Sequence, residues 1–287
     1  MIANSRCIAC ILSKQERKIR KNSDEQKKKE YIHKVLKILY EYGTKECAPM
    51  VEKRIKDIYK EYYEEDVDYA VLKHRYNQYM LEKEEEIRAH IQKNNDIETC
   101  IKYVCAGNYI DFGVANKIDQ LLQGLLDKVN ELKISKKEVA YLEDELAQAK
   151  TLLYITDNCG EIVLDKIFIE ELQNKYKNLQ ITAMVRGGIA SNDATMEDAE
   201  EIGLTNVVPV IGNGAAIMGT VKEQLSEEAK EKIQNADVII AKGMGNFESM
   251  YQEEMNPYYL LLCKCELYKE TFGVEMFQPI FCKEERL

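Results

Sequence analysis

Oxygen-bearing side chains follow two short apolar runs in the second half of the chain. Asp157 and Asn158 come directly after the run Thr151–Thr156, and Asp193 lies a few residues beyond the run Gln180–Val185. Carboxylate and amide oxygens suit Mg²⁺ or Mn²⁺, and Mg²⁺ typically leaves positions open for water and a phosphate. We therefore expect Asp157, Asn158 and Asp193 to be metal ligands and catalytic residues. Asp157 and Asp193 are also residue types that cap helices, so a structural role stays open for both.

Cationic side chains and a helix start follow the same runs. Arg186 follows the second run, and Lys264 lies in or just after the fifth. The start of a helix near Gly160–Glu161 is a ready site for an anion. Lys264 is flanked by apolar residues and cysteines, so we expect it to be buried and charged, with Asp157 or Asp193 as its partner. Together these groups could hold a phosphate beside a cation.

Five apolar runs alternate with polar stretches, and most of these stretches are long enough for crossover helices. The runs are Thr151–Thr156, Gln180–Val185, Asn206–Ile211, Asp237–Ala241 and Tyr258–Leu262. Continuous apolar strands that alternate with helices predict a parallel sheet covered on both faces. Ligands of such a sheet bind beyond the carboxyl ends of its strands.

The first half of the chain has a different texture. It is dense in Lys, Glu, Leu, Ile and Tyr, and stretches such as Tyr31–Tyr42 carry apolar residues at helical spacing. We therefore predict an α/β protein with two domains. An all-helical domain over 1–148 covers the site, and a Rossmann-like three-layer sandwich with a mainly parallel sheet spans 149–287.

Composition excludes several classes of protein. The chain has 287 residues and a net charge of −10, which argues against a nucleic-acid or anionic membrane partner unless a local basic patch overrides it. No apolar stretch reaches the roughly 18 residues of a transmembrane helix, and we expect a cytoplasmic protein. All three histidines lie in the first half, which excludes a Ser–His–Asp triad built wholly from the second. The nine cysteines are an odd number and are expected to be reduced thiols.

Six ordered blocks of the sequence resemble the damage-control phosphatase family, long catalogued as domain of unknown function 89, in its prokaryotic branch. Four blocks end or follow predicted strands, and two lie in the first half of the chain. They are DNCGEIVLD at 157–165, VRGG with NDAT at 185–195, KGMGNFE at 242–248, Lys264-Cys265, the CxxC of Cys7 and Cys10, and GNYIDFG at 107–113. Cys159 stands where the family block has Ala.

The resemblance implies a metal-dependent phosphatase that acts on small phosphorylated metabolites, either sugar phosphates or damaged phosphometabolites. It implies Mg²⁺ or Mn²⁺, with Co²⁺ or Ni²⁺ also possible, held by Asp157, Asn158 and Asp193. Lys264 is expected to be catalytic and to contact substrate. The expected substrate-binding residues, from the residues and the resemblance together, are Asn108, Asp111, Glu161, Arg186, Met244, Gly245, Asn246, Phe247, Glu248 and Lys264.

Several alternatives remain open at the level of sequence. A metal-bound water is favoured as nucleophile over attack by Asp157, because Cys159 stands where the DxD signature of haloacid-dehalogenase-type phosphatases has its second Asp. A Rossmann-like sheet would also suit an S-adenosylmethionine-dependent carboxyl methyltransferase. Cys7 and Cys10 could form a metal or redox pair, which would make the protein a sensor. Neither the phosphate ester nor the oligomeric state can be named.

Overall fold

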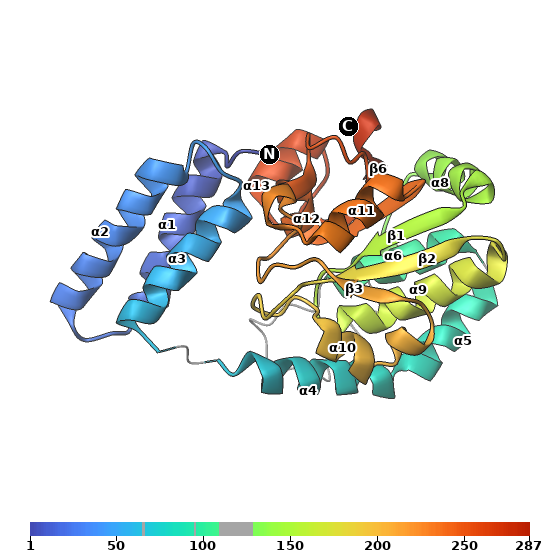
Figure 1. The fold of residues 1–287 in the computed structure, drawn as a ribbon, viewed down its shortest axis with the longest axis horizontal. Helices are drawn as coiled ribbons and strands as arrows, with labels where there is room; N and C mark the ends of the chain where they lie inside the picture. The colour runs from blue at the N-terminus through green and yellow to red at the C-terminus, as the bar shows by residue number, and fades with distance from the viewer. Residues whose placement is uncertain (65–66, 95, 109–128) are drawn as a thin grey trace.

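The first three helices form a unit with its own apolar core. The computed structural model describes residues 1–64, 67–94, 96–108 and 129–287. Helices α1 (Ser5–Ile19), α2 (Glu25–Tyr42) and α3 (Ala48–Tyr62) pack on one another, apart from the sheet (Figure 1). Asn4 and Asp24 cap α1 and α2 by accepting hydrogen bonds from backbone amides of the first turn.

The next helices belong to the core of the sheet. Their bounds are α4 (Tyr69–Glu82), α5 (Glu84–Asn94), α6 (Ile97–Gly107) and α8 (Lys136–Gln148). Apolar side chains of all four share one cluster with the sheet and with α9 (Glu161–Lys175). The change in texture near residue 148 does coincide with the end of α8. The apolar core, however, crosses that position.

Six strands form one sheet. They are β1 (Thr151–Ile155), β2 (Gln180–Val185), β3 (Val210–Gly212), β4 (Val238–Lys242), β5 (Tyr258–Leu262) and β6 (Pro279–Lys283). Their order is β3-β2-β1-β4-β5-β6, with the first five strands parallel and β6 antiparallel to β5. The predicted α/β fold with a mainly parallel sheet is confirmed.

Side chains of each strand alternate between two helical layers. Leu152 and Tyr154 pack with α9, whereas Leu153 and Ile155 pack on the opposite face with Phe247. The second layer holds α11 (Glu227–Asn235), α12 (Gly243–Met250) and α13 (Glu266–Phe272), and the short helix α10 (Met196–Glu201) lies on the α9 side (Figure 1). Short 3₁₀ turns cover Leu204–Asn206, Lys222–Gln224 and Glu284–Arg286.

Two details of the sheet differ from the prediction. The predicted strand Asn206–Ile211 is mostly not a strand, because it begins in a 3₁₀ turn and Pro209 has no amide proton for a ladder. Only its last two residues join β3. The sixth strand was not predicted, since its apolar stretch is short and irregular. No helix within the described part of the chain is both long and apolar enough to span a membrane.

Candidate active site

The loops after β1 and β2 are joined by backbone hydrogen bonds, which brings the predicted ligands together. The amide of Ala194 donates to the carbonyl of Asp157 at 2.7 Å, and the amide of Cys159 donates to the carbonyl of Asn192 at 2.9 Å. Asn158 and Asp193 face each other in an isolated antiparallel bridge. Because Ile155 lies opposite both Met184 and Ala241, strands β1, β2 and β4 end at the same edge. The site therefore forms there.

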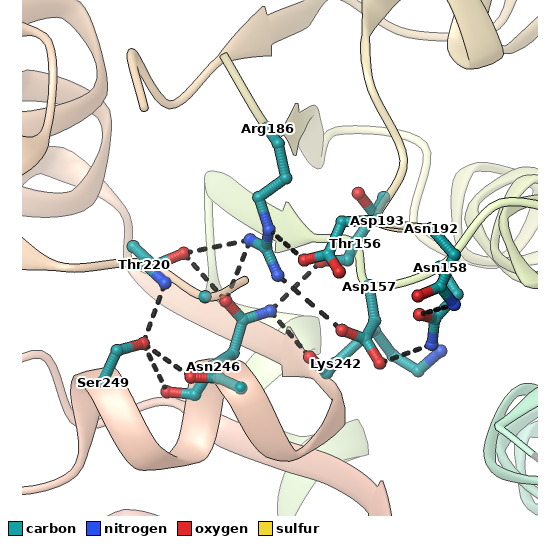
Figure 2. A network of polar contacts seen from close by, with 12 residues as sticks. Thr156, Asp157, Asn158, Arg186, Asn192, Asp193, Thr220, Lys242, Asn246 and Ser249 are labelled. Carbon is teal, nitrogen blue, oxygen red and sulfur yellow. Dashed lines mark hydrogen bonds and ion pairs between the residues drawn. The ribbon is translucent and has the colours of Figure 1, made fainter. Parts of the chain in front are cut away.

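Arg186, directly after β2, is the cation of this edge. Its Nε donates to Oδ2 of Asp193 at 2.6 Å, and its Nη1 donates to Oδ1 of Asn246 at 3.0 Å (Figure 2). Its Nη2 lies 3.7 Å from Oδ1 of Asp157 and has no hydrogen-bond partner within the described part of the chain. The guanidinium thus faces both predicted carboxylate ligands, and one of its buried donors is left over.

Asn246 holds Arg186 in this position. Its amide nitrogen donates to the carbonyls of Thr156 and Lys242, at 3.1 and 2.6 Å. Its amide oxygen accepts from Arg186 and from the hydroxyl of Thr220, the latter at 2.8 Å (Figure 2). Both ends of this buried amide are therefore engaged, so Asn246 orients the arginine.

Lys242, the last residue of β4, is a second buried cation. Its ammonium pairs with Glu161 and with Oδ1 of Asp165, the latter at 2.9 Å. Oδ1 of Asp165 also accepts from the hydroxyl of Tyr154 at 2.7 Å. Burial alone would lower the pKa of Lys242, but the charges of Asp165 and Glu161 raise it above its ordinary value. Lys242 is thus committed to two carboxylates and is not available to a substrate.

Glu161 links Lys242 to the predicted ligands. It is fully buried at the start of α9, where one oxygen accepts from Asn108 at 2.5 Å and the other from Asn158 at 3.0 Å. Asn108, at the end of α6, also donates to Oδ2 of Asp157 at 3.4 Å. Asn108 and Glu161 therefore reach the site as predicted, but in the structure Glu161 fixes the positions of other residues.

Gly243 forms a cradle for the carboxylate of Asp157. It has a φ of +79°, and a Cβ at this position would lie 2.0 Å from Oδ2 of Asp157. Only glycine allows this approach, and its φ is one that other residues rarely adopt. The first residue of α12 therefore places the Asp157 carboxylate beside the positive end of a helix.

Buried negative charge exceeds buried positive charge around these strand ends. Four buried carboxylates, those of Asp157, Glu161, Asp165 and Asp193, lie near two buried cations, Arg186 and Lys242. Burial, with the charges of Asp193 and Glu161, raises the pKa of Asp157 to about 8. Burial likewise raises the pKa of Asp165 to about 6. A divalent cation would offset this excess.

The donor set of Asp157, Asn158 and Asp193 consists of hard oxygens and fits Mg²⁺ or Mn²⁺. Within the described ranges, no group of three or more His, Cys, Asp or Glu side chains is placed to bind a metal. A site here therefore has two carboxylates and an amide as its protein ligands. Mg²⁺ commonly uses such a small set and completes its coordination with water and phosphate.

Lys264 does not occupy the predicted position. It lies two residues beyond β5 and is partly exposed, and no hydrogen bond or ion pair joins it to another described residue. The prediction that it is buried against Asp157 or Asp193 is wrong, because Arg186 takes that place. A contact between Lys264 and substrate stays a prediction.

The KGMGNFE block is helical after its first residue: Lys242 ends β4, and Gly243 begins α12. Phe247 lies in the apolar core, where its ring meets the ring of Tyr259 edge-on at 4.9 Å, and the partly exposed Met244 packs against that core. Gly245 packs so tightly that a Cβ would lie 2.7 Å from the carbonyl oxygen of Met218. Phe247 therefore faces the core, and Glu248 faces Tyr268 of α13. The predicted contacts of Met244, Gly245, Asn246, Phe247 and Glu248 with substrate stay a prediction.

Glu248 faces a different environment from the site. The hydroxyl of Tyr268 donates to its Oε1 at 3.2 Å. Burial, together with the charge of Glu52, raises the pKa of Glu248 to about 7.

The remaining predicted residues are separate from this group or cannot be placed. Asp111 lies outside the described residues. Cys7 is half-buried and Cys10 exposed, one turn apart on α1, and all nine cysteines are free thiols. Burial raises the pKa of Cys7, which makes it less reactive. Their role as a metal or redox pair stays a prediction.

Sequence reasoning missed the structural roles of Asp165 and Gly243. Asp165 lies in a helix whose apolar residues cover most of its circumference, so it had to be buried and to need a cation. That pattern was a usable signal. The contact of Gly243 with Asp157 left no signal in the sequence, since the two residues are 86 positions apart.

Comparisons with known proteins agree with this architecture. Residues 3–280 match the family model described as damage-control phosphatase ARMT1-like domain. A damage-control phosphatase of Archaeoglobus fulgidus is 30% identical over 281 residues, covering 94% of this chain and 95% of that protein. A damage-control phosphatase of Pyrococcus horikoshii is 36% identical over 194 residues, 66% of this chain and 67% of that protein.

Two further relatives extend the comparison. An uncharacterised protein of Methanocaldococcus jannaschii is 36% identical over 227 residues, 75% of this chain and 73% of that protein. The crystal structure of a Pyrococcus horikoshii protein of the DUF89 family matches with a TM-score of 0.81 at 25% identity, over 99% of each chain. Two of these relatives are named phosphatases, which supports a phosphatase role and does not favour the methyltransferase alternative. The chain belongs to the damage-control phosphatase ARMT1-like domain family.

Proposed function

We propose that this protein is a metal-dependent phosphatase that hydrolyses small phosphorylated metabolites. The observation that carries the proposal is the excess of buried carboxylates at the ends of β1, β2 and β4. Such a group is costly to bury without a cation. Asp157, Asn158 and Asp193 are the proposed ligands, and Mg²⁺ or Mn²⁺ is the proposed ion.

The bound ion would supply Lewis-acid polarisation of a phosphoryl oxygen. Arg186 is held against Asp193 by Asn246, so it orients this ligand. Burial raises the pKa of Asp193, and the charge and hydrogen bond of Arg186 offset part of that rise. Its Nη2, which has no hydrogen-bond partner among the described residues, is a donor for a further oxygen at the same edge. The partly exposed ammonium of Lys264 is available to neutralise charge on the phosphate.

Water is the proposed nucleophile. It attacks phosphorus, the P–O bond to the metabolite breaks, and one proton of the attacking water ends on the leaving oxygen, so that the products are an alcohol and phosphate. Attack by Asp157 is disfavoured by its contacts, because its Oδ2 accepts from Asn158 at 2.7 Å and its Oδ1 faces Arg186. The carboxylate also rests against Gly243, so little room is left for an in-line approach.

Phosphate release from a panel of about a hundred phosphate esters tests the proposal. The assay is run with Mg²⁺, Mn²⁺, Co²⁺ and Ni²⁺ and with excess EDTA. We expect turnover that is lost in EDTA and restored by one of these ions. Full turnover in excess chelator would rule out the metal-dependent reaction. Binding of Mn²⁺ to Asp193→Ala, followed by electron paramagnetic resonance, tests the ligand assignment separately, and binding as tight as in the wild type would contradict it.

A further inference from the structure

A pocket of about 220 Å³ lies between the first helices and two loops of the sheet. Its lining includes Lys18 of α1, Lys53 and Lys56 of α3, Ser191 after β2 and Met218 after β3. Figure 1 shows these loops extending from the sheet toward α3. The pocket is smaller than the about 300–1,000 Å³ that hold a complete small-molecule ligand, so it accommodates part of one.

The pocket adjoins the candidate active site through both loops. Ser191 precedes Asn192, whose side chain donates to Oδ1 of Asn158 at 2.6 Å. On the other side, Met218 packs against Gly245, the residue before Asn246. A molecule whose phosphate lies at Asp157 and Asp193 could therefore extend into the pocket.

The charge of this pocket is opposite to that of the whole chain. Among the described residues, Lys18, Lys53 and Lys56 line it, together with one carboxylate, Glu52. Glu52 is paired with Lys14 at 3.0 Å, and Lys53 is paired with Asp57 at 2.5 Å. Lysines thus outnumber carboxylates among the described lining residues, in a chain with a net charge of −10. This local basic patch attracts anions.

In this pocket, lysine ammonium groups lie over the rings of Tyr59 and Tyr69, where a nucleobase would otherwise stack. The ammonium of Lys18 lies 3.3 Å from the ring centre of Tyr59, and that of Lys56 lies 5.3 Å from the ring centre of Tyr69. A base that stacked on those faces would displace the ammonium groups. An anion would instead bind to them, so the arrangement favours a charged group over a planar base.

We propose that this pocket binds a second anionic group of the substrate, a phosphate or a carboxylate, remote from the phosphate that is hydrolysed. This inference rests on the proposed function. It narrows the substrate class to metabolites with two anionic ends. Binding energy from the remote end would help to hold the reacting phosphate in place.

Three sugar phosphates that differ in whether they carry a second anionic group, and in which one, test the inference. Glucose 6-phosphate has one anionic group, glucose 1,6-bisphosphate adds a phosphate, and 6-phosphogluconate adds a carboxylate. The variant carries Lys18→Gln, Lys53→Gln and Lys56→Gln together, which keeps good helix formers at each position. The control carries Lys37→Gln, Lys60→Gln and Lys177→Gln, three exposed lysines outside the lining that give the same change in net charge.

We expect the wild type to have a higher kcat/KM for at least one doubly anionic substrate than for glucose 6-phosphate. The pocket variant should lose that advantage by about tenfold or more, through KM, while its kcat/KM for glucose 6-phosphate stays within about twofold. A response confined to the bisphosphate or to the carboxylate identifies the group. The inference is overturned if the wild type shows no preference, or if the control variant loses as much as the pocket variant.

A binding measurement separates this inference from the proposed function. Titration calorimetry with glucose 1,6-bisphosphate, in the presence of Mn²⁺, requires no turnover. If the wild type hydrolyses none of the esters but binds this probe about tenfold more tightly than the pocket variant, the phosphatase proposal fails and the anion pocket stands. Equal binding by both proteins, each with a wild-type thermal midpoint, rejects the pocket.

Discussion

The two buried cations at the strand ends act on different parts of the molecule. Arg186, after β2, binds Asp193 and faces Asp157, so its partners are the proposed ligands. Lys242, at the end of β4, binds Glu161 and Asp165, so both of its partners belong to α9. Figure 2 shows the guanidinium of Arg186 between the carboxylates and Asn246. One cation therefore sets the charge of the site, and the other anchors a helix.

The chemistry of each side chain fits its role. A guanidinium has five donors in a planar fork, so Arg186 can contact Asp193, Asn246 and Thr220 at once. An ammonium is compact, and Lys242 fits where the sheet is closely covered by α9. The two are nevertheless connected, because Asn246 accepts from Arg186 and donates to the carbonyl of Lys242. The variants below test how far the two roles separate.

The largest effect on stability should come from Lys242→Met. It leaves Glu161 and Asp165 buried without their cation, and breaking a buried pair in this way costs about 3–5 kcal/mol. Urea denaturation measures the loss in the free energy of unfolding. Adding Asp165→Asn should restore part of that loss. If Lys242→Met alone changes the free energy by less than about 1 kcal/mol, Lys242 does not anchor α9.

Asp193→Asn should have the largest effect on catalysis. It keeps the volume and an acceptor for Arg186 but removes a ligand charge, so turnover should fall by at least about a hundredfold. The melting temperature should change far less than in Lys242→Met. Phosphate release and calorimetric Mn²⁺ binding measure the two consequences. Wild-type Mn²⁺ affinity in Asp193→Asn would mean that Arg186 and Asp193 form a structural pair.

Lys264→Met tests a third cation, which no described residue binds. Because Lys264 is partly exposed and has no hydrogen bond or ion pair with another described residue, the fold should be unaffected. If its ammonium contacts the phosphate, turnover should fall by about a hundredfold, comparable to the loss of one preorganised contact. Lys264→Arg, which keeps the charge, should retain more activity than Lys264→Met. Equal activity of Lys264→Met and wild type would leave Arg186 as the cation of the site.

Gly243→Ala should displace the Asp157 carboxylate from the Arg186 side of the site. The methyl group would lie within 2.0 Å of Oδ2, and the positive φ adds strain of about 1–3 kcal/mol. We expect about a tenfold fall in turnover and a small loss of stability. Gly273→Ala is the matched control, since Gly273 also has a positive φ but an added Cβ there meets nothing within 4 Å. Equal activities of the two variants would show that the cradle does not matter for catalysis.

The smallest effect concerns Glu248, a half-buried carboxyl that accepts a hydrogen bond from the hydroxyl of Tyr268. Burial, with the charge of Glu52, raises the pKa of this carboxyl from 4.5 to about 7. The folded state then binds more protons than the unfolded state, so stability falls as the pH rises from about 4.5 to about 7 and levels off above. Glu248→Gln should flatten this part of the profile. Thermal melts at pH 5 and pH 8 measure it, and an unchanged slope would show that Glu248 has an ordinary pKa.

Local pattern was sufficient to predict the elements that carry the site. Runs of consecutive apolar residues mark β1, β2, β4 and β5, because strands buried on both faces leave no room for polar side chains. Asp157, Asn158 and Asp193 could be grouped because neighbouring parallel strands end at one edge. The resemblance added Asn108, which no spacing pattern in this sequence would have joined to Asp157.

The pairing of charges was decided by tertiary structure. Which cation faces Asp193 depends on how far each side chain reaches across the sheet edge. Arg186, in the same loop after β2, reaches Asp193, whereas Lys264 does not. The KGMGNFE block has two glycines and resembles a loop, yet it is helical because Gly245 and Asn246 pack and hydrogen-bond to residues far away in sequence. Local spacing determines which residues reach the edge, and packing determines which of them touch.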